Sequence, residues 1–419
     1  MTQPPLTLSL QIVLSCLLLV STCHAQPTQV WTPESVLLQI QGEHPAIKAA
    51  TIQSEGALDY SKGAGAQPNP HIRLALTRGT TQEDANSLTQ VLEVAGQPKL
   101  RKKIATRLHD QAQQQEAIVV RQTSMVALHA YYDLWLSRRR LETAEKLCEH
   151  TTRLEQLAAS RLSNGDISRD EYRRSKLERL SADSKVAQER ALYLANEARF
   201  RTLLQLDPTC PVSLPDSPTP PTLAQLELPS RERLLEGVQQ LPELQLARAA
   251  AHRKTLEVEL AGKAGAPDLF VYAYRGNYSR VAPSGVQVGI SFPLFDWGQD
   301  GAEISRKRAQ AEAAQELVES ERINWQMKVL ESWESHQGRL EQVTILQAQV
   351  TELKELADHS LIAYEAGYTS LLDVLTMRND YRTALLSLLE QSVQLEKEKW
   401  ELSWLAQGEP NLTEMDPNL

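Results

Sequence analysis

Two long stretches of the chain carry the residue pattern of extended helices. Neither residues 99–207 nor residues 294–409 contain a proline, and both are rich in Ala, Leu, Glu, Gln and Arg. Gly165 and Gly367 are the glycines best placed to turn the chain within them, and Gly338 is a weaker interruption. Each stretch therefore predicts a helical hairpin, whose longer arm would extend about 100 Å at about 1.5 Å per residue.

Shorter segments alternate between apolar and polar residues and predict strands. They span residues 71–77, 88–94, 269–275 and 285–292. The last is the clearest, because Val286, Val288 and Ile290 alternate with small or polar residues. One apolar and one polar face suit a barrel wall with lipid outside and water inside, whereas a soluble sandwich is the alternative.

The two halves of the chain repeat one another. Pro45 matches Pro242 and Pro70 matches Pro267 at one constant offset, and the matches after the strands follow a second, slightly larger offset. Those later pairs are Gly96 with Gly298, Gly165 with Gly367, and Pro208 with Pro410. The predicted unit is a helix, two strands and a long helical hairpin.

This duplication predicts the organisation of the whole chain. The predicted parts are a signal peptide (1–25), a first repeat (26–207), a Pro-rich linker (208–229), a second repeat (230–410) and a C-terminal tail (411–419).

The first 25 residues have the pattern of a secretory signal peptide. An apolar run over residues 8–20 is followed by small residues that favour cleavage before Gln26. A membrane anchor is the alternative, but the run is shorter than the roughly 20 residues that a spanning helix needs. Lipidation at Cys23 also stays open.

If the strands face lipid, this chain must associate with other protomers. A sheet edge in the bilayer would leave backbone groups unpaired, so a membrane sheet must close into a barrel. The smallest membrane barrels have about eight strands, and four are predicted here. Several protomers are therefore expected to share one barrel.

Residues 288–314 change abruptly from alternation to a helical pattern. Pro293 is expected to end strand pairing, and Trp297 to lie in the aromatic belt at the membrane boundary. Gly298 would then let the chain turn into the helix, and Gly96 holds the equivalent position in the first half.

Charge and motifs exclude other classes of protein. The formal net charge of −9 argues against a nucleic-acid partner, which needs clustered cations. The sequence carries no HExxH, P-loop, GxSxG or paired CxxC motif, so no catalytic residue, cofactor or resident metal is predicted and no enzyme is expected. Residues 148–150, Cys-Glu-His, are interpreted as helix surface. A secreted hydrolase or metalloprotein would lack any supporting motif.

The sequence resembles the TolC-like outer-membrane efflux proteins, the outer-membrane factors of tripartite efflux pumps. The resemblance rests on residues 291–298 (SFPLFDWG), on residues 364–375 (YEAGYTSLLDVL) and on the duplication, and it covers nearly all of the mature chain. Residues 90–99 are similar to a junction in the heavy-metal-efflux branch, although the Gly-Lys-Arg of that junction is absent.

The resemblance implies a mainly α fold with a small β part. Four strands per protomer would form a twelve-stranded outer-membrane barrel in a homotrimer, and the helical hairpins would continue it as an α-barrel in the periplasm. A periplasmic adaptor and an inner-membrane pump would be its partners. The implied function is passive export of small toxic molecules or metal cations; a duct for type I protein secretion and a periplasmic coiled-coil adaptor are the alternatives.

The resemblance also places a gate at the periplasmic tip, beside Gly165 and Gly367. Asp373 matches a family position at the constriction, and Glu171 is its counterpart in the first half. Both could instead be helix-start acids favoured by the helix dipole. Tyr364 matches a tyrosine that links adjacent helix pairs, with an acid near Glu171 as the expected partner.

Two residues depart from the family pattern at this tip. Thr369 and Thr376 stand where some members carry an arginine and a second acid. The closed tip is therefore expected to be held differently, with Arg169, Arg173 and Arg174 as candidates.

Overall fold

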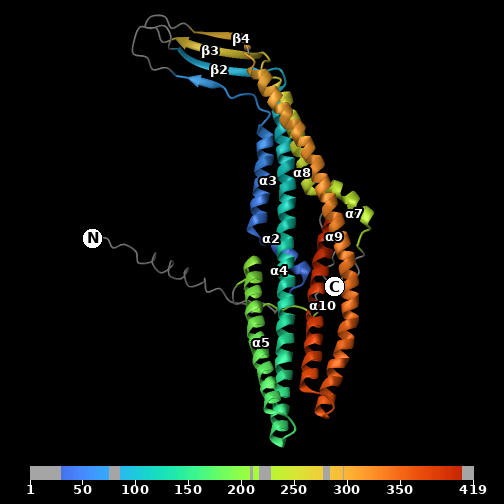
Figure 1. Cartoon of the computed structure of the whole chain (residues 1–419). Coiled ribbons are helices and arrows are strands. Elements are labelled where there is room, and N and C mark those ends of the chain that lie inside the picture. The colour runs from blue at the N-terminus through green and yellow to red at the C-terminus, as the bar shows by residue number, and fades with distance from the viewer. Residues whose placement is uncertain are drawn as a thin grey trace, which may run out of the picture.

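A four-stranded sheet lies at one end of a long helical rod in the computed structural model of the chain (Figure 1). The structure describes residues 30–74, 85–207, 211–216, 228–276, 284–295 and 297–407. The predicted mainly helical fold with a small β part is confirmed. The expected signal peptide and the tail from residue 411 onward lie outside the described residues.

The same order of elements occurs twice along the chain. The first half contains α2 (Pro33–Glu43), α3 (Pro45–Gly63), β1 (His71–Arg73), β2 (Ala85–Glu93), α4 (Gln97–Asn164) and α5 (Arg169–Leu203). The second half contains α7 (Arg231–Gly237), the 3-10 turn η1 (Val238–Gln240), α8 (Pro242–Ala261), β3 (Asp268–Gly276), β4 (Ser284–Ser291), α9 (Gln299–Glu365) and α10 (Leu371–Gln407).

The repeat unit predicted from the sequence lacks the short helices α2 and α7. His44 and Leu241 adopt extended conformations, each directly before the proline that begins the next helix. His44 thus ends α2, and Leu241 ends the segment formed by α7 and η1. Each of these short segments also begins with its own cap, because the side chains of Thr32 and Ser230 accept hydrogen bonds from backbone N–H groups.

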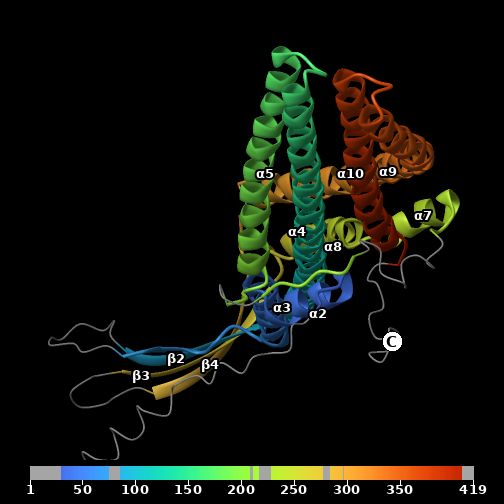
Figure 2. The ribbon, with the colours of Figure 1, turned by 90° about the horizontal axis from the view of Figure 1, so that it is seen from below.

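The helices α4 and α9 run from the sheet to the far end of the rod (Figure 1). They contain 68 and 67 residues, or about 100 Å each, and Gly338 does not interrupt α9. The helices α3 and α5 pack on α4, and α8 and α10 pack on α9. Seen from below, α4 with α5 and α9 with α10 form two adjacent hairpins (Figure 2). No helix within the described ranges is both long enough and apolar enough to cross a membrane.

The largest hydrophobic core lies around the middle of α4. Most of its members come from α2, α4, the end of α5 and the second half of α10, and they include Leu37, Tyr132, Phe200 and Trp400. The indole Nε1 of Trp400 donates a hydrogen bond to the hydroxyl of Tyr132 at 2.9 Å, and Lys397 pairs with Asp133 at 2.6 Å. This core therefore joins the two halves of the chain.

Part of the predicted linker packs against this core. Ser213 forms an isolated parallel bridge with Val30, and its carbonyl accepts a hydrogen bond from the backbone N–H of Trp31 at 2.9 Å. The indole of Trp135 donates to the carbonyl of Pro215 at 3.1 Å. The linker residues 208–210 and 217–227 lie outside the described part of the chain.

The sheet is antiparallel, in the order β1-β2-β3-β4. Val271 lies opposite both Gln90 and Val288, and Phe270 lies opposite Gly289. Within the described residues neither β1 nor β4 has a second neighbouring strand, so the sheet has two unpaired edges.

Each face of the sheet has its own composition. One face carries aliphatic residues, of which Ile72, Leu88, Val286, Val288 and Ile290 are exposed and Val271 is half-buried. The aromatic residues of β3 lie on the other face, and the glycines of β4 leave room for their rings, since an added Cβ at Gly289 would overlap Phe270. The sequence pattern showed the alternation in each strand, but only the register shows that these two sets lie on opposite faces.

Leu37 is fully buried in the core, whereas its neighbour Leu38 is 62% exposed. We expect Leu37→Ala to lower the free energy of unfolding by about 2–5 kcal/mol, because it removes buried methyl groups and leaves a cavity. Leu38→Ala is the matched control and should change it much less. Thermal unfolding of the purified protein, followed by circular dichroism, measures the difference; equal shifts for both variants would contradict this assignment of the core.

Candidate functional site at the hairpin tips and sheet junctions

The two hairpins turn with the same backbone geometry. Gly165 and Gly367 have φ angles of 84° and 83°, a left-handed conformation that favours glycine. The N–H of Asp166 donates to the carbonyl of Arg161 at 2.9 Å, and the N–H of Tyr368 donates to the carbonyl of Ala363 at 2.8 Å. Both turns thus satisfy the carbonyls left free at the end of a long helix.

Both return helices begin with a serine cap. The hydroxyl of Ser168 accepts a hydrogen bond from the N–H of Glu171 at 3.2 Å. The Oδ2 atom of Asp373 accepts hydrogen bonds from the hydroxyl of Ser370 at 2.7 Å and from that of Thr369 at 3.1 Å, which lower the pKa of Asp373. The exposed carboxylate of Asp373 therefore has a local capping role.

Tyr364 connects the tips of the two hairpins. Its side chain is 1% exposed and packs with Leu154 of α4 and Val374 of α10. The guanidinium of Arg161 lies 4.9 Å from the ring centroid and donates a hydrogen bond to the carbonyl of Tyr364 at 3.1 Å. The contact of Tyr364 across the hairpins is thus with a cation of α4.

The expected acid near Glu171 does not hydrogen-bond to Tyr364 in the described structure. Burial raises the pKa of Tyr364; Arg161 opposes this shift, and the charge of Glu171 reinforces it. Glu171 is therefore close enough to act electrostatically. The backbone of Tyr364 instead accepts its hydrogen bond from Arg161.

Sequence reasoning missed Arg161. The signal that could have found it is its position in the last turn of α4, where a cation is favoured by the free carbonyls and can reach a neighbouring tip. Arg173, one of the expected candidates to hold the closed tip, lies 3.7 Å from the carboxylate of Asp170 on its own helix. Thr376 donates a hydrogen bond to the carbonyl of Leu372 at 2.9 Å.

At the other end of the rod, glycines join the sheet to the long helices. Gly96 and Gly298, with φ angles of 90° and 83°, directly precede α4 and α9. Pro293 follows the end of β4 at Ser291. Trp297 has a φ of 50° and is 91% exposed, so its indole points away from the protomer at the junction.

Within the described residues, no group of three or more His, Cys, Asp or Glu side chains is placed to hold a metal ion. The thiol of Cys148 donates a hydrogen bond to Asp183 across α4 and α5 at 3.0 Å. This hydrogen bond raises the pKa of Cys148. The thiol is thus part of the contact between two helices.

Known proteins share this architecture. Over 378 residues the chain is 24% identical to the cobalt-zinc-cadmium resistance protein CzcC of Cupriavidus metallidurans, covering 87% of each chain. The structure matches that of CusC, described as forming a transmembrane channel, with a TM-score of 0.78, 13% identity and coverage of 91% of this chain and 95% of that one. It matches the Campylobacter jejuni outer membrane channel CmeC with a TM-score of 0.72, 11% identity and coverage of 91% and 88%.

The sequence also matches a family profile. Residues 236–403 match the profile described as outer membrane efflux protein, a region that includes β3, β4 and the second hairpin. The resemblance to the outer-membrane efflux proteins predicted from the sequence is thus confirmed over residues 236–403 by this match. The solved outer-membrane channels share the fold of about nine tenths of the chain.

Proposed function

We propose that this chain is the outer-membrane exit duct of a tripartite efflux system. The observation that carries the proposal is a sheet with one aliphatic face and, among the described strands, two unpaired edges, held at one end of helices about 100 Å long. A lipid-facing wall joined to a rod of this length suits a channel that spans the outer membrane and extends through the periplasm. The duct is passive and has no enzymatic activity.

A barrel shared between protomers follows from the requirement to close the sheet, and the resemblance to the efflux proteins implies that three copies share it. Four strands cannot enclose a pore, because the smallest membrane barrels have about eight. Three copies would supply twelve strands and pair β4 of one protomer with β1 of the next. In this arrangement the aliphatic face contacts lipid and the aromatic and glycine residues line the water-filled side.

The proposed partners are a periplasmic adaptor and an inner-membrane pump, which would deliver the cargo and supply the energy. Metal cations are the first cargo to test, because the curated relative is a cobalt-zinc-cadmium resistance protein. Other small toxic molecules are the second. A periplasmic adaptor would not need an exposed aliphatic sheet, and a type I secretion duct would instead be recognised by its protein cargo.

The proposed gate lies at the hairpin tips. Arg161 and Tyr364 would hold the two hairpins together, and three copies of Asp373 would place negative charge around the narrow end. Gly165 and Gly367 shape the turns beside them, and Glu171 supplies a second acid.

The aliphatic face of β4 allows a test of membrane insertion. We expect Val288→Arg to reduce recovery of the outer-membrane oligomer, because a cation on the lipid face of a barrel costs about 2–4 kcal/mol near the bilayer centre. Gln287→Arg, one residue away on the opposite face, is the control and should still assemble. Membrane fractionation and mild-detergent electrophoresis measure both; equal recovery of the two variants would argue against a lipid-facing Val288.

The charge of Asp373 can be separated from its capping role. We expect Asp373→Ala to weaken block of the purified channel by divalent cations in a planar bilayer, because the ring of carboxylates is lost. Ser370→Ala removes the cap but keeps the carboxylate, and should retain the block. If both variants changed block equally, the effect would come from the helix end and not from the charge.

The contact between Arg161 and Tyr364 is expected to stabilise the closed state of the tip. We expect Arg161→Gln to raise the resting conductance of the channel, because the guanidinium no longer joins α4 to the last turn of α9. Arg190→Gln, which removes an exposed ion pair with Glu145 elsewhere on the same hairpin, is the control. Single-channel recordings should distinguish them; an unchanged closed level in Arg161→Gln would assign the gate to other contacts.

A further inference from the structure

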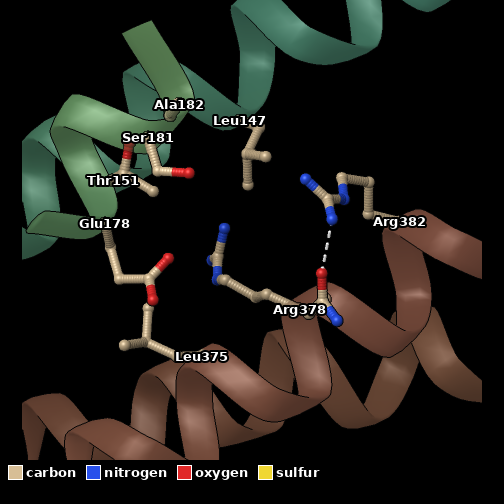
Figure 3. A pocket seen from close by; sticks show the side chains of 9 residues that line it. Leu147, Thr151, Glu178, Ser181, Ala182, Leu375, Arg378 and Arg382 are labelled. Atoms are coloured by element: carbon tan, nitrogen blue, oxygen red, sulfur yellow. Dashed lines mark hydrogen bonds between the residues drawn. The ribbon is translucent and has the colours of Figure 1, made fainter. Parts of the chain in front are cut away.

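Two adjoining cavities lie between the hairpins, above the tip contact. The larger, of about 230 Å³, is lined by α4, α9 and α10, and the smaller, of about 50 Å³, by α4, α5 and α10. Leu147, Arg378 and Arg382 line both, and we call the combined space the Arg378 cavity. Figure 3 shows Arg378 reaching from α10 toward α4 and α5, with Arg382 beside it.

The Arg378 cavity is basic in a chain whose formal net charge is −9. Its basic residues are Lys146, Lys354, Arg378 and Arg382, and its acids are Glu178 and Asp358. In the described part of the chain, none of these four cations lies within 4.0 Å of a carboxylate oxygen. Many other Arg and Lys residues of the same helices do have such ion pairs, including Arg140 with Glu390 at 2.5 Å.

Arg378 is the most enclosed of these cations. Its side chain is 9% exposed, and its Nε atom has no hydrogen-bond acceptor in the described structure. Other buried charges of the rod are paired: Glu189 with Lys185 at 3.0 Å, and Glu398 with Arg339 at 3.0 Å. An unpaired buried guanidinium carries a large desolvation cost, so the site lacks an acceptor that would offset it.

The local electrostatics agree with a cavity of positive potential. Burial lowers the pKa of Arg378, and the charge of Asp358 opposes this shift. Burial, reinforced by Arg378 and Arg153, also lowers the pKa of His150, which lines the larger cavity. A neutral imidazole beside these cations can still donate a hydrogen bond.

We propose that the Arg378 cavity binds a small oxyanion of the phosphate or sulfate class. Guanidinium groups match the oxygens of such anions with paired, charge-assisted hydrogen bonds, and Arg378 and Arg382 project into the same space. The volume of the larger cavity is several times the roughly 30 Å³ that one water molecule occupies in the liquid. A hydrated oxyanion therefore fits. The site is lined by helices of the rod, away from the sheet, which favours a soluble anion over a lipid headgroup.

Such an anion would brace the two hairpins. It would contact cations of α10 and, through Lys146, of α4, which belong to different hairpins. Since an anion that binds one arrangement of the hairpins shifts the population toward it, bound oxyanion would stabilise the arrangement seen here. The inference concerns ligand binding within the rod and does not depend on the cargo of the duct.

Calorimetric titration of the purified, detergent-solubilised full-length protein with sodium phosphate tests this proposal, against sodium chloride at equal ionic strength. We expect saturable binding of phosphate, weakened at least about tenfold in Arg378→Gln because a charge-assisted pair is lost. Arg306→Gln removes an exposed arginine of α9 and should bind phosphate normally. Absence of saturable binding at millimolar phosphate, or equal binding by Arg378→Gln and the parent, would overturn the proposal.

Thermal unfolding gives a second readout that separates binding from misfolding. In phosphate-free buffer Arg378→Met should unfold at or above the parent's temperature, because an unpaired buried charge has been removed. Phosphate should raise the unfolding temperature of the parent but not that of the variant. Arg382→Gln, which keeps Arg378, should show an intermediate phosphate response; equal phosphate shifts in the parent and both variants would refute the site.

Discussion

Unpaired backbone groups at the two edges of the sheet, as the described strands form it, are the constraint on which the rest of the molecule depends. In lipid no water can satisfy the N–H and C=O groups along β1 and β4, so only a neighbouring strand can do so. The four strands of the described residues are too few to close on themselves. In the proposed trimer, the copy number, the lipid-facing aliphatic surface and the common direction of the long helices would all serve this closure.

Contacts between the two hairpins differ in kind along the rod. Around the middle of α4, large aromatic side chains and an ion pair join α4 to α10. Nearer the turns, a basic cavity separates the same helices, and at the tips a small cluster and Arg161 make the contact. Because local opening is easiest where few apolar contacts are buried, the tip half of the rod is the part suited to move.

Glycine and proline act locally, which is why the sequence predicts the hairpins, the turns at Gly165 and Gly367, and the strand segments. The neighbours of Arg161 and Arg378 across the hairpins could not be predicted, because each neighbour is a side chain or backbone group about 200 residues away. The opposite faces of Phe270 and Val288 depend on strand register, which alternation alone does not specify. The short helices α2 and α7 have too few residues to give a clear period.

The nearly equal lengths of α4 and α9, 68 and 67 residues, limit how this chain can evolve. Deleting one residue from one of them would draw its turn back by about 1.5 Å and rotate every later side chain by about 100° relative to its neighbours. The pairing of Arg161 with Tyr364 would then be out of alignment. Insertions and deletions in the rod are therefore tolerated only when both halves change together, so the duplicated halves must keep a common length as their sequences diverge.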